Sequence, residues 1–114
     1  MSEDCPLKET DIRRLALRRP GAVEMDHHGF PSFRAAGRIF CTVRVEPRRL
    51  MVKLNAEDQH NLCEAYPGVI APVPGYWGRK GSTYVDYGRI SENLADRLIA
   101  MAFANVAPRS RRAG

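Results

Sequence analysis

The chain has 114 residues, of which 44% are hydrophobic and 27% are charged. This composition is ordinary for a soluble globular protein and excludes a disordered one, and the length predicts one domain with a single core. The net charge is +5, but Arg109, Arg111 and Arg112 supply three of these charges, so charge alone suggests a nucleic-acid partner without establishing one. The acidic start precedes no apolar run, so we expect no signal peptide, no membrane span and a cytoplasmic location.

The cysteines and histidines do not predict a metal or catalytic site. Cys5, Cys41 and Cys63 are far apart and odd in number, which indicates a reducing compartment and packed thiols. His27 and His28 follow Asp26, but adjacent residues on a strand face opposite sides and would not hold one ion together. We therefore expect structural histidines, no metal, no cofactor and no catalytic residue.

The first predicted element is a helix that begins near Thr10 and ends at Pro20-Gly21. Thr10 is a favourable N-cap residue. Ile12, Leu15 and Ala16 recur at the spacing of one helical face, so this face should pack on the core.

The central stretch, residues 33–54, predicts strands joined by turns. The strands are Phe33–Arg34, Arg38–Val45 and Leu50–Leu54. Alternation in the second strand divides its side chains between two faces. Ile39, Cys41, Val43 and Val45 are expected to face the core, and Arg38, Phe40, Thr42 and Arg44 the opposite, open face. Phe40 is thus expected to be exposed beside Met51, and Phe40→Glu should separate a dimer without unfolding the chain.

The remaining elements are a helix, two strands and a helix. Asn55 should cap the helix whose inner face carries Gln59, Leu62, Cys63 and Tyr66. The two strands are expected at 69–72 and 82–87, and Ser91 should cap a long final helix with a broad apolar surface. The order α-β3-α-β2-α predicts an α+β domain of two layers, with an antiparallel five-stranded sheet and three helices on one face.

The loop between the last two strands, residues 73–81, combines glycines with Tyr76, Trp77, Arg79 and Lys80. It lacks the spacing of a nucleotide-binding Walker motif, and a strand follows it rather than a helix. Two interpretations remain open. Trp77 packs on the core, or the aromatic and basic residues form a surface for base stacking and phosphate contact.

Several strings of the chain resemble the MmcQ/YjbR family. They are Leu15-Ala16-Leu17 with Pro20-Gly21-Ala22, Gly29-Phe30-Pro31-Ser32-Phe33-Arg34, Gly37-Arg38-Ile39-Phe40, Met51-Val52-Lys53-Leu54, Pro72-Val73-Pro74-Gly75-Tyr76-Trp77-Gly78 and Asn105-Val106-Ala107-Pro108. The resemblance covers residues 7–108 and leaves 109–114 as a basic tail. It implies an antiparallel sheet with helices on one side and a DNA-binding role with a double-wing arrangement.

These observations favour a non-catalytic DNA-binding protein that contacts phosphates through basic strand connections. The residues expected to bind are Arg48, Arg49, Arg79 and Lys80, extended by Arg38, Arg44, Lys53 and Trp77. The alternative is a protein-interaction or homodimerising module that uses the open sheet face. An enzyme is the least supported class, because few titratable groups converge.

Overall fold

The sheet of this protein has six antiparallel strands in the order β1-β2-β3-β4-β6-β5. The computed structural model describes residues 6–27 and 29–106. The strands are β1 (Val23–His27), β2 (Phe30–Ala35), β3 (Arg38–Arg44), β4 (Arg49–Lys53), β5 (Ile70–Pro72) and β6 (Ser82–Val85). The helices are α1 (Glu9–Leu17), α2 (Ala56–Ala65), α3 (Tyr76–Arg79) and α4 (Glu92–Val106), with a short 3-10 helix at Tyr87–Arg89. None of the described helices is long and apolar enough to cross a membrane.

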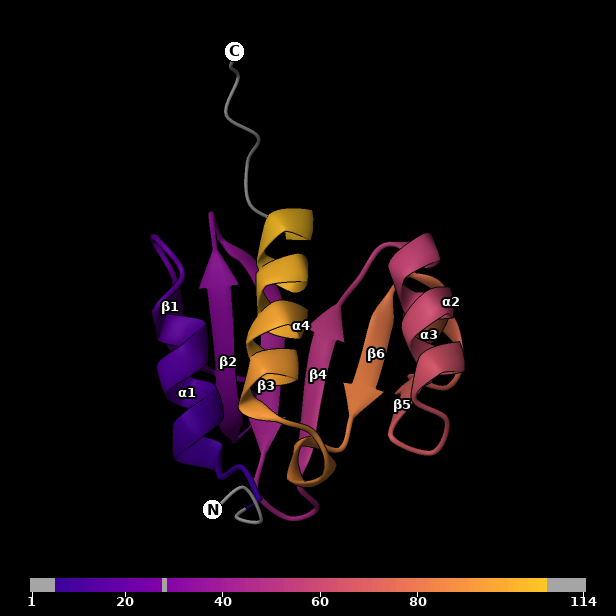
Figure 1. The fold of residues 1–114 in the computed structure, drawn as a ribbon. Coiled ribbons are helices and arrows are strands. Elements are labelled where there is room, and N and C mark those ends of the chain that lie inside the picture. Colours follow the sequence, from indigo (N-terminus) through magenta and orange to yellow (C-terminus); the bar gives the residue numbers. More distant parts are fainter. Residues whose placement is uncertain (1–5, 28, 107–114) are drawn as a thin grey trace.

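The α+β class is confirmed, and α1, α4 and α2 lie on the same side of the sheet (Figure 1). The core lies between this helical layer and the sheet, and α4 runs across β3 and β4. Ile12, Leu15 and Ala16 of α1 are fully buried, as their spacing predicts. Within residues 6–27 and 29–106, the opposite face of the sheet has no comparable layer, and it is called here the open face.

Two of the predicted helix caps are confirmed. The backbone N–H of Asp58 donates to Asn55 Oδ1 over 2.8 Å, and that of Leu94 donates to Ser91 Oγ over 3.1 Å. The first helix instead begins at Glu9, one residue before Thr10, because Asp11 accepts a hydrogen bond from the backbone of Lys8.

The prediction of five strands is wrong by one, since β1 was not recognised. In β1, Val23 and Met25 face one side and Glu24 and Asp26 the other. Both Val23 and Met25 are about half exposed, at 54% and 48%. An edge strand with no fully buried side lacks the hydrophobic signal that identified the central strands.

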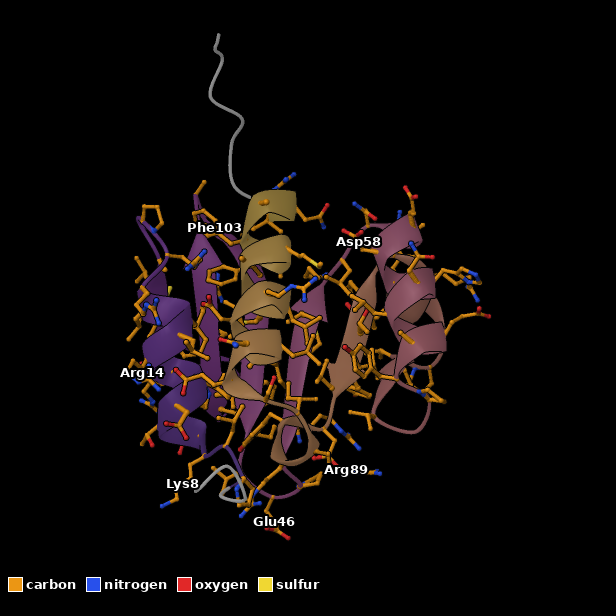
Figure 2. All side chains as sticks on the ribbon, in the orientation of Figure 1. Lys8, Arg14, Glu46, Asp58, Arg89 and Phe103 are labelled. Carbon is orange, nitrogen blue, oxygen red and sulfur yellow. The ribbon has the colours of Figure 1, made fainter. Side chains whose placement is uncertain are left out.

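A β-bulge in β3 reverses part of the predicted alternation. The consecutive residues Phe33 and Arg34 of β2 pair with Cys41 and Ile39, so Phe40 is the extra residue on β3. Phe40 is therefore directed toward the helical layer with Cys41, and its ring meets that of Phe103 edge to face at 5.5 Å. Phe103 lies near the C-terminal end of α4 (Figure 2).

Three expectations for this strand are wrong, two because of the bulge and one because β3 ends at Arg44. Phe40 is fully buried rather than exposed, and Ile39 pairs with Arg34 on the open face rather than in the core. Val45 lies beyond β3 in the turn and is 56% exposed. The expected dimer-breaking effect of Phe40→Glu is consequently wrong, because the substitution would place a carboxylate in the core.

Candidate nucleic-acid interface

The register of the central strands defines the open face. Thr42 pairs with Met51, and Met51 pairs with Tyr84, so these three side chains lie in a row across β3, β4 and β6. Their neighbours along the strands, such as Leu50 and Val52, are fully buried on the opposite side. Alternation thus gives the sheet one apolar face against the helices and one mixed face that carries the candidate site.

A cleft with a volume of about 1040 Å³ runs over the open face. Its floor includes Ile39, Thr42, Met51 and Tyr84, and its rim is built by the β2–β3 hairpin, α3 and the end of α4. Asn105 of α4 donates to the carbonyl oxygen of Lys53 over 3.2 Å and ties this helix end to β4.

Among the described residues, the cleft is lined by four cations and by no carboxylate. The four are Arg34, Arg38, Lys53 and Lys80. The ion pairs found among the described residues involve other cations, namely Arg13, Arg14, Arg19 and His60. The positive charge in the cleft is therefore not neutralised by neighbouring side chains within the described part of the chain.

Four cationic side chains of the cleft and the open face lie next to aromatic rings. The pairs, with the distance from the cationic group to the ring centroid, are Arg44 and Phe30 at 4.2 Å, Arg49 and Tyr84 at 4.2 Å, Lys53 and Trp77 at 5.4 Å, and Lys80 and Tyr76 at 5.7 Å. Each pair holds a long cationic side chain near the sheet. Such an array combines the two groups that nucleic acids require, one for phosphates and one for bases.

The α3 segment is held in place by close backbone packing. A Cβ on Gly78 would lie 1.8 Å from the carbonyl oxygen of Val73, so only glycine allows this approach. Gln59 Nε2, from α2, reaches the carbonyl oxygen of Gly78 at 3.0 Å and Thr83 Oγ1 at 3.0 Å. Trp77 and Lys80 are thereby carried by a segment that is fixed to both α2 and β6.

The structure brings together most, but not all, of the residues predicted to bind. Arg38, Lys53, Lys80 and Trp77 line the cleft. Arg44 and Arg49 lie on the open face, where they contact the rings of Phe30 and Tyr84. The other two predicted residues, Arg48 in the β3–β4 turn and Arg79 on α3, are exposed but do not line the cleft.

The two predicted basic pairs lie at opposite ends of β4. Arg49 begins this strand, whereas Lys53 at its end pairs with Ser82, which follows the loop that carries Lys80. Four residue steps separate the ends, which corresponds to roughly 14 Å at about 3.4 Å per residue. The pairs therefore do not form one cluster, and the open face lies between them.

Arg34 also lines the cleft, although it is not among the residues that the sequence predicts to bind. It pairs with Ile39 on the open face, and its Nε atom is buried without a hydrogen-bond partner among the described residues. Strand alternation indicates this position, because Arg34 stands between Phe33 and Ala35, whose side chains are buried on the opposite face.

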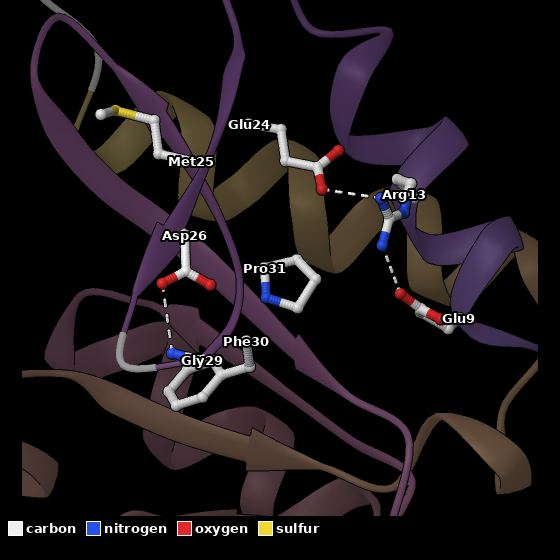
Figure 3. Close-up of a pocket in the computed structure, with 8 residues that line it drawn as sticks. All are labelled: Glu9, Arg13, Glu24, Met25, Asp26, Gly29, Phe30 and Pro31. Carbon is white, nitrogen blue, oxygen red and sulfur yellow. Dashed lines mark hydrogen bonds and ion pairs between the residues drawn. The ribbon is translucent and has the colours of Figure 1, made fainter.

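A second hollow, of about 560 Å³, lies between α1 and the β1–β2 hairpin (Figure 3). Arg13 donates to Glu24 over 2.7 Å and also pairs with Glu9, and the hydrogen bond to Glu9 is the main cause that raises the pKa of Arg13. Asp26 accepts a hydrogen bond from the backbone of Gly29 at 3.3 Å. The charged side chains that line this hollow therefore already have partners within it.

The histidines and cysteines lie partly within and partly outside the described residues. His28 and the side chain of His27 lie outside the described residues, as do Cys5 and the tail at 109–114. Within the described ranges no group of three potential metal ligands occurs. Cys41 and Cys63 are free thiols, and burial raises the pKa of each, which makes both poor nucleophiles.

Comparison with known proteins agrees with this architecture. The crystal structure of Deinococcus radiodurans protein DR2400, which carries the domain DUF419, is similar with a TM-score of 0.74 and 19% sequence identity, over 93% of this chain and 82% of that chain. At this identity the likeness establishes the fold alone. No curated protein gave a significant match. The model of the YjbR family matches residues 17–105, a range that contains all six strands and most of α4, and the chain therefore belongs to the YjbR family.

Proposed function

We propose that this domain binds DNA without catalysing a reaction, and that the cleft on the open face supplies its phosphate contacts. The observation that carries the proposal is the lining of the cleft, which holds four cations and no carboxylate. DNA affinity is dominated by contacts of Lys and Arg with phosphates, which release counterions. A concave surface of one charge sign also raises the local concentration of an oppositely charged partner.

The placement of the basic residues supports a contact along the sheet. Arg49 begins β4, and Lys53 ends it near Lys80, while Arg34 lies on β2 across the open face. In this proposal a DNA strand lies along the open face, with its phosphates contacted by basic residues at both ends of β4. The DNA-binding role implied by the family resemblance is consistent with this arrangement.

The homodimer alternative now depends on a different part of the open face. Burial of Phe40 removes the main apolar residue from the surface on which that alternative rested. Val23 and Met25, on the edge strand β1, are exposed and favour pairing with a second edge. A dimer through β1 predicts that Met25→Lys yields a monomer in size-exclusion chromatography, with DNA binding retained.

The DNA proposal is tested with Arg38→Ala, Lys53→Ala and Lys80→Ala combined in one variant. We expect weaker binding to a duplex and a shallower dependence of log K on log salt, by about 0.9 per lost phosphate contact and about 2.7 in total. The affinity is measured at several salt concentrations from the fluorescence anisotropy of labelled DNA.

A variant with the same net charge serves as the control. Arg18→Ala, Arg89→Ala and Arg97→Ala remove three exposed cations outside the cleft, and the salt dependence should change little. Deletion of residues 109–114, which contain three arginines, separates the tail from the folded domain. Loss of binding on tail deletion with an unaffected cleft variant, or no binding of the intact chain at low salt, would contradict the proposal.

A further inference from the structure

We infer that the cleft on the open face takes unpaired bases of single-stranded DNA, with Trp77 as the stacking platform. The inference rests on the proposed DNA-binding function and specifies the form of DNA. Three features of the structure carry it: the exposure of Trp77, the ammonium groups beside the aromatic pair, and the apolar floor of the cleft.

Trp77 is both strongly exposed and well positioned. Trp77 is 59% exposed although it has the bulkiest side chain of the cleft, and Tyr76 beside it is 55% exposed. The two rings meet edge to face, with centroids 5.2 Å apart. Close packing of Gly78 on Val73 holds the short helix that carries both rings. A fixed aromatic side chain that the fold leaves in water is a typical binding residue.

Positive charge lies next to this aromatic pair. Lys53 Nζ is 5.4 Å from the centroid of the Trp77 ring, and Lys80 Nζ is 5.7 Å from that of Tyr76. A base that stacks on either ring therefore has an ammonium group close enough to meet its own phosphate. Alternation of stacking rings and cations is the usual design of surfaces that bind single strands.

The floor of the cleft distinguishes a single strand from a duplex. Ile39, Met51 and Tyr84, with the single hydroxyl of Thr42 beside them, make a mostly apolar floor, whereas the cations Arg38 and Lys80 belong to its exposed rim. A duplex presents phosphates outward and keeps the faces of its bases stacked inside, so it would contact the rim and leave the apolar floor and Trp77 unused. An unpaired strand can place bases on the floor and phosphates at the rim.

The chain contains one tryptophan, so its intrinsic fluorescence reports on this site directly. The intact protein is titrated with an oligothymidylate of about 15 nucleotides, within the range of site sizes known for single strands. A duplex of the same length and inorganic polyphosphate, which has no bases, are titrated in parallel. We expect saturable quenching by the oligothymidylate, at lower concentration than by the duplex, and no quenching by polyphosphate.

Variants then identify the contribution of the ring. Trp77→Ala should weaken binding of a labelled oligothymidylate about tenfold or more, measured by anisotropy, while Trp77→Phe retains most of the affinity. Tyr66→Ala, which removes an exposed aromatic residue at the end of α2, is the matched control and should have no effect. Unchanged melting temperatures would show that the losses do not come from unfolding.

The outcomes separate this inference from the function on which it rests. Equal affinity of Trp77→Ala and the intact chain, together with loss of binding in the Arg38, Lys53 and Lys80 variant, would overturn stacking and leave phosphate binding intact. Tighter binding of the duplex without quenching would do the same. If none of the nucleic acids binds even at low salt, both the inference and the proposed function are wrong.

Discussion

Replacing Phe40 with alanine is expected to lower the free energy of unfolding by about 3–5 kcal/mol. The ring is fully buried beneath α4 and meets Phe103 edge to face, so its removal forfeits apolar burial and leaves a cavity. Domains of this size have a total stability of about 5–15 kcal/mol, so the loss would be a large fraction of it. Urea denaturation followed by circular dichroism measures the change.

The neighbouring residue provides the control for this prediction. Ile39 lies on the open face and is only partly buried, so Ile39→Ala should cost clearly less, about 1 kcal/mol. Strict alternation without the bulge predicts the reverse order. A larger loss of unfolding free energy for Ile39→Ala than for Phe40→Ala would therefore contradict the bulge and indicate that Phe40 is exposed.

Replacing Gly81 with alanine is expected to destabilise the domain by roughly 3 kcal/mol or more. A Cβ at this position would lie 2.1 Å from the carbonyl oxygen of Leu54, and Gly81 has a φ of +107°. The clash is with backbone, which cannot rotate away as a side chain does. Because the carbonyl oxygen of Gly81 also accepts the backbone N–H of Leu54 at 2.9 Å, relief of the clash would disturb the junction of β4 and α2.

Gly21 is the matched control, since it shares the positive φ but not the contact. Its φ is +75°, and a Cβ there would meet nothing within 4 Å. Gly21→Ala should therefore cost only about 1–2 kcal/mol for the left-handed conformation. Thermal unfolding midpoints of the two variants are compared. The additional loss of stability in Gly81→Ala measures the cost of the steric clash with Leu54. Equal losses would show that the approach of Gly81 to Leu54 is not close.

Much of the fold follows from patterns that are local in the sequence. The helical spacing of Ile12, Leu15 and Ala16 and the cap residues Asn55 and Ser91 identify helices, because each pattern concerns residues within a few positions of one another. Strands such as β4 are equally evident from alternation, which Leu50 and Val52 confirm by complete burial.

Two features of the structure depended on partners distant in the sequence. The bulge at Phe40 exists because β3 must satisfy both its pairing with β2 and its packing under α4, and alternation in one strand contains neither constraint. Arg34 and Lys80 share a cleft only because the order of strands brings β2 and the α3 segment onto one face.

The sequence by itself determined the class of the domain, its family resemblance and the presence of basic and aromatic residues in turns and strands. Only the tertiary structure decided which of these residues lie together on one face. Sheet register selects one side of each strand, so Lys53, Lys80 and Trp77 meet in the cleft while Arg48 and Arg79 remain outside it. The physical reason is that composition sets the total charge, whereas the density of charge on a surface depends on how distant segments pair.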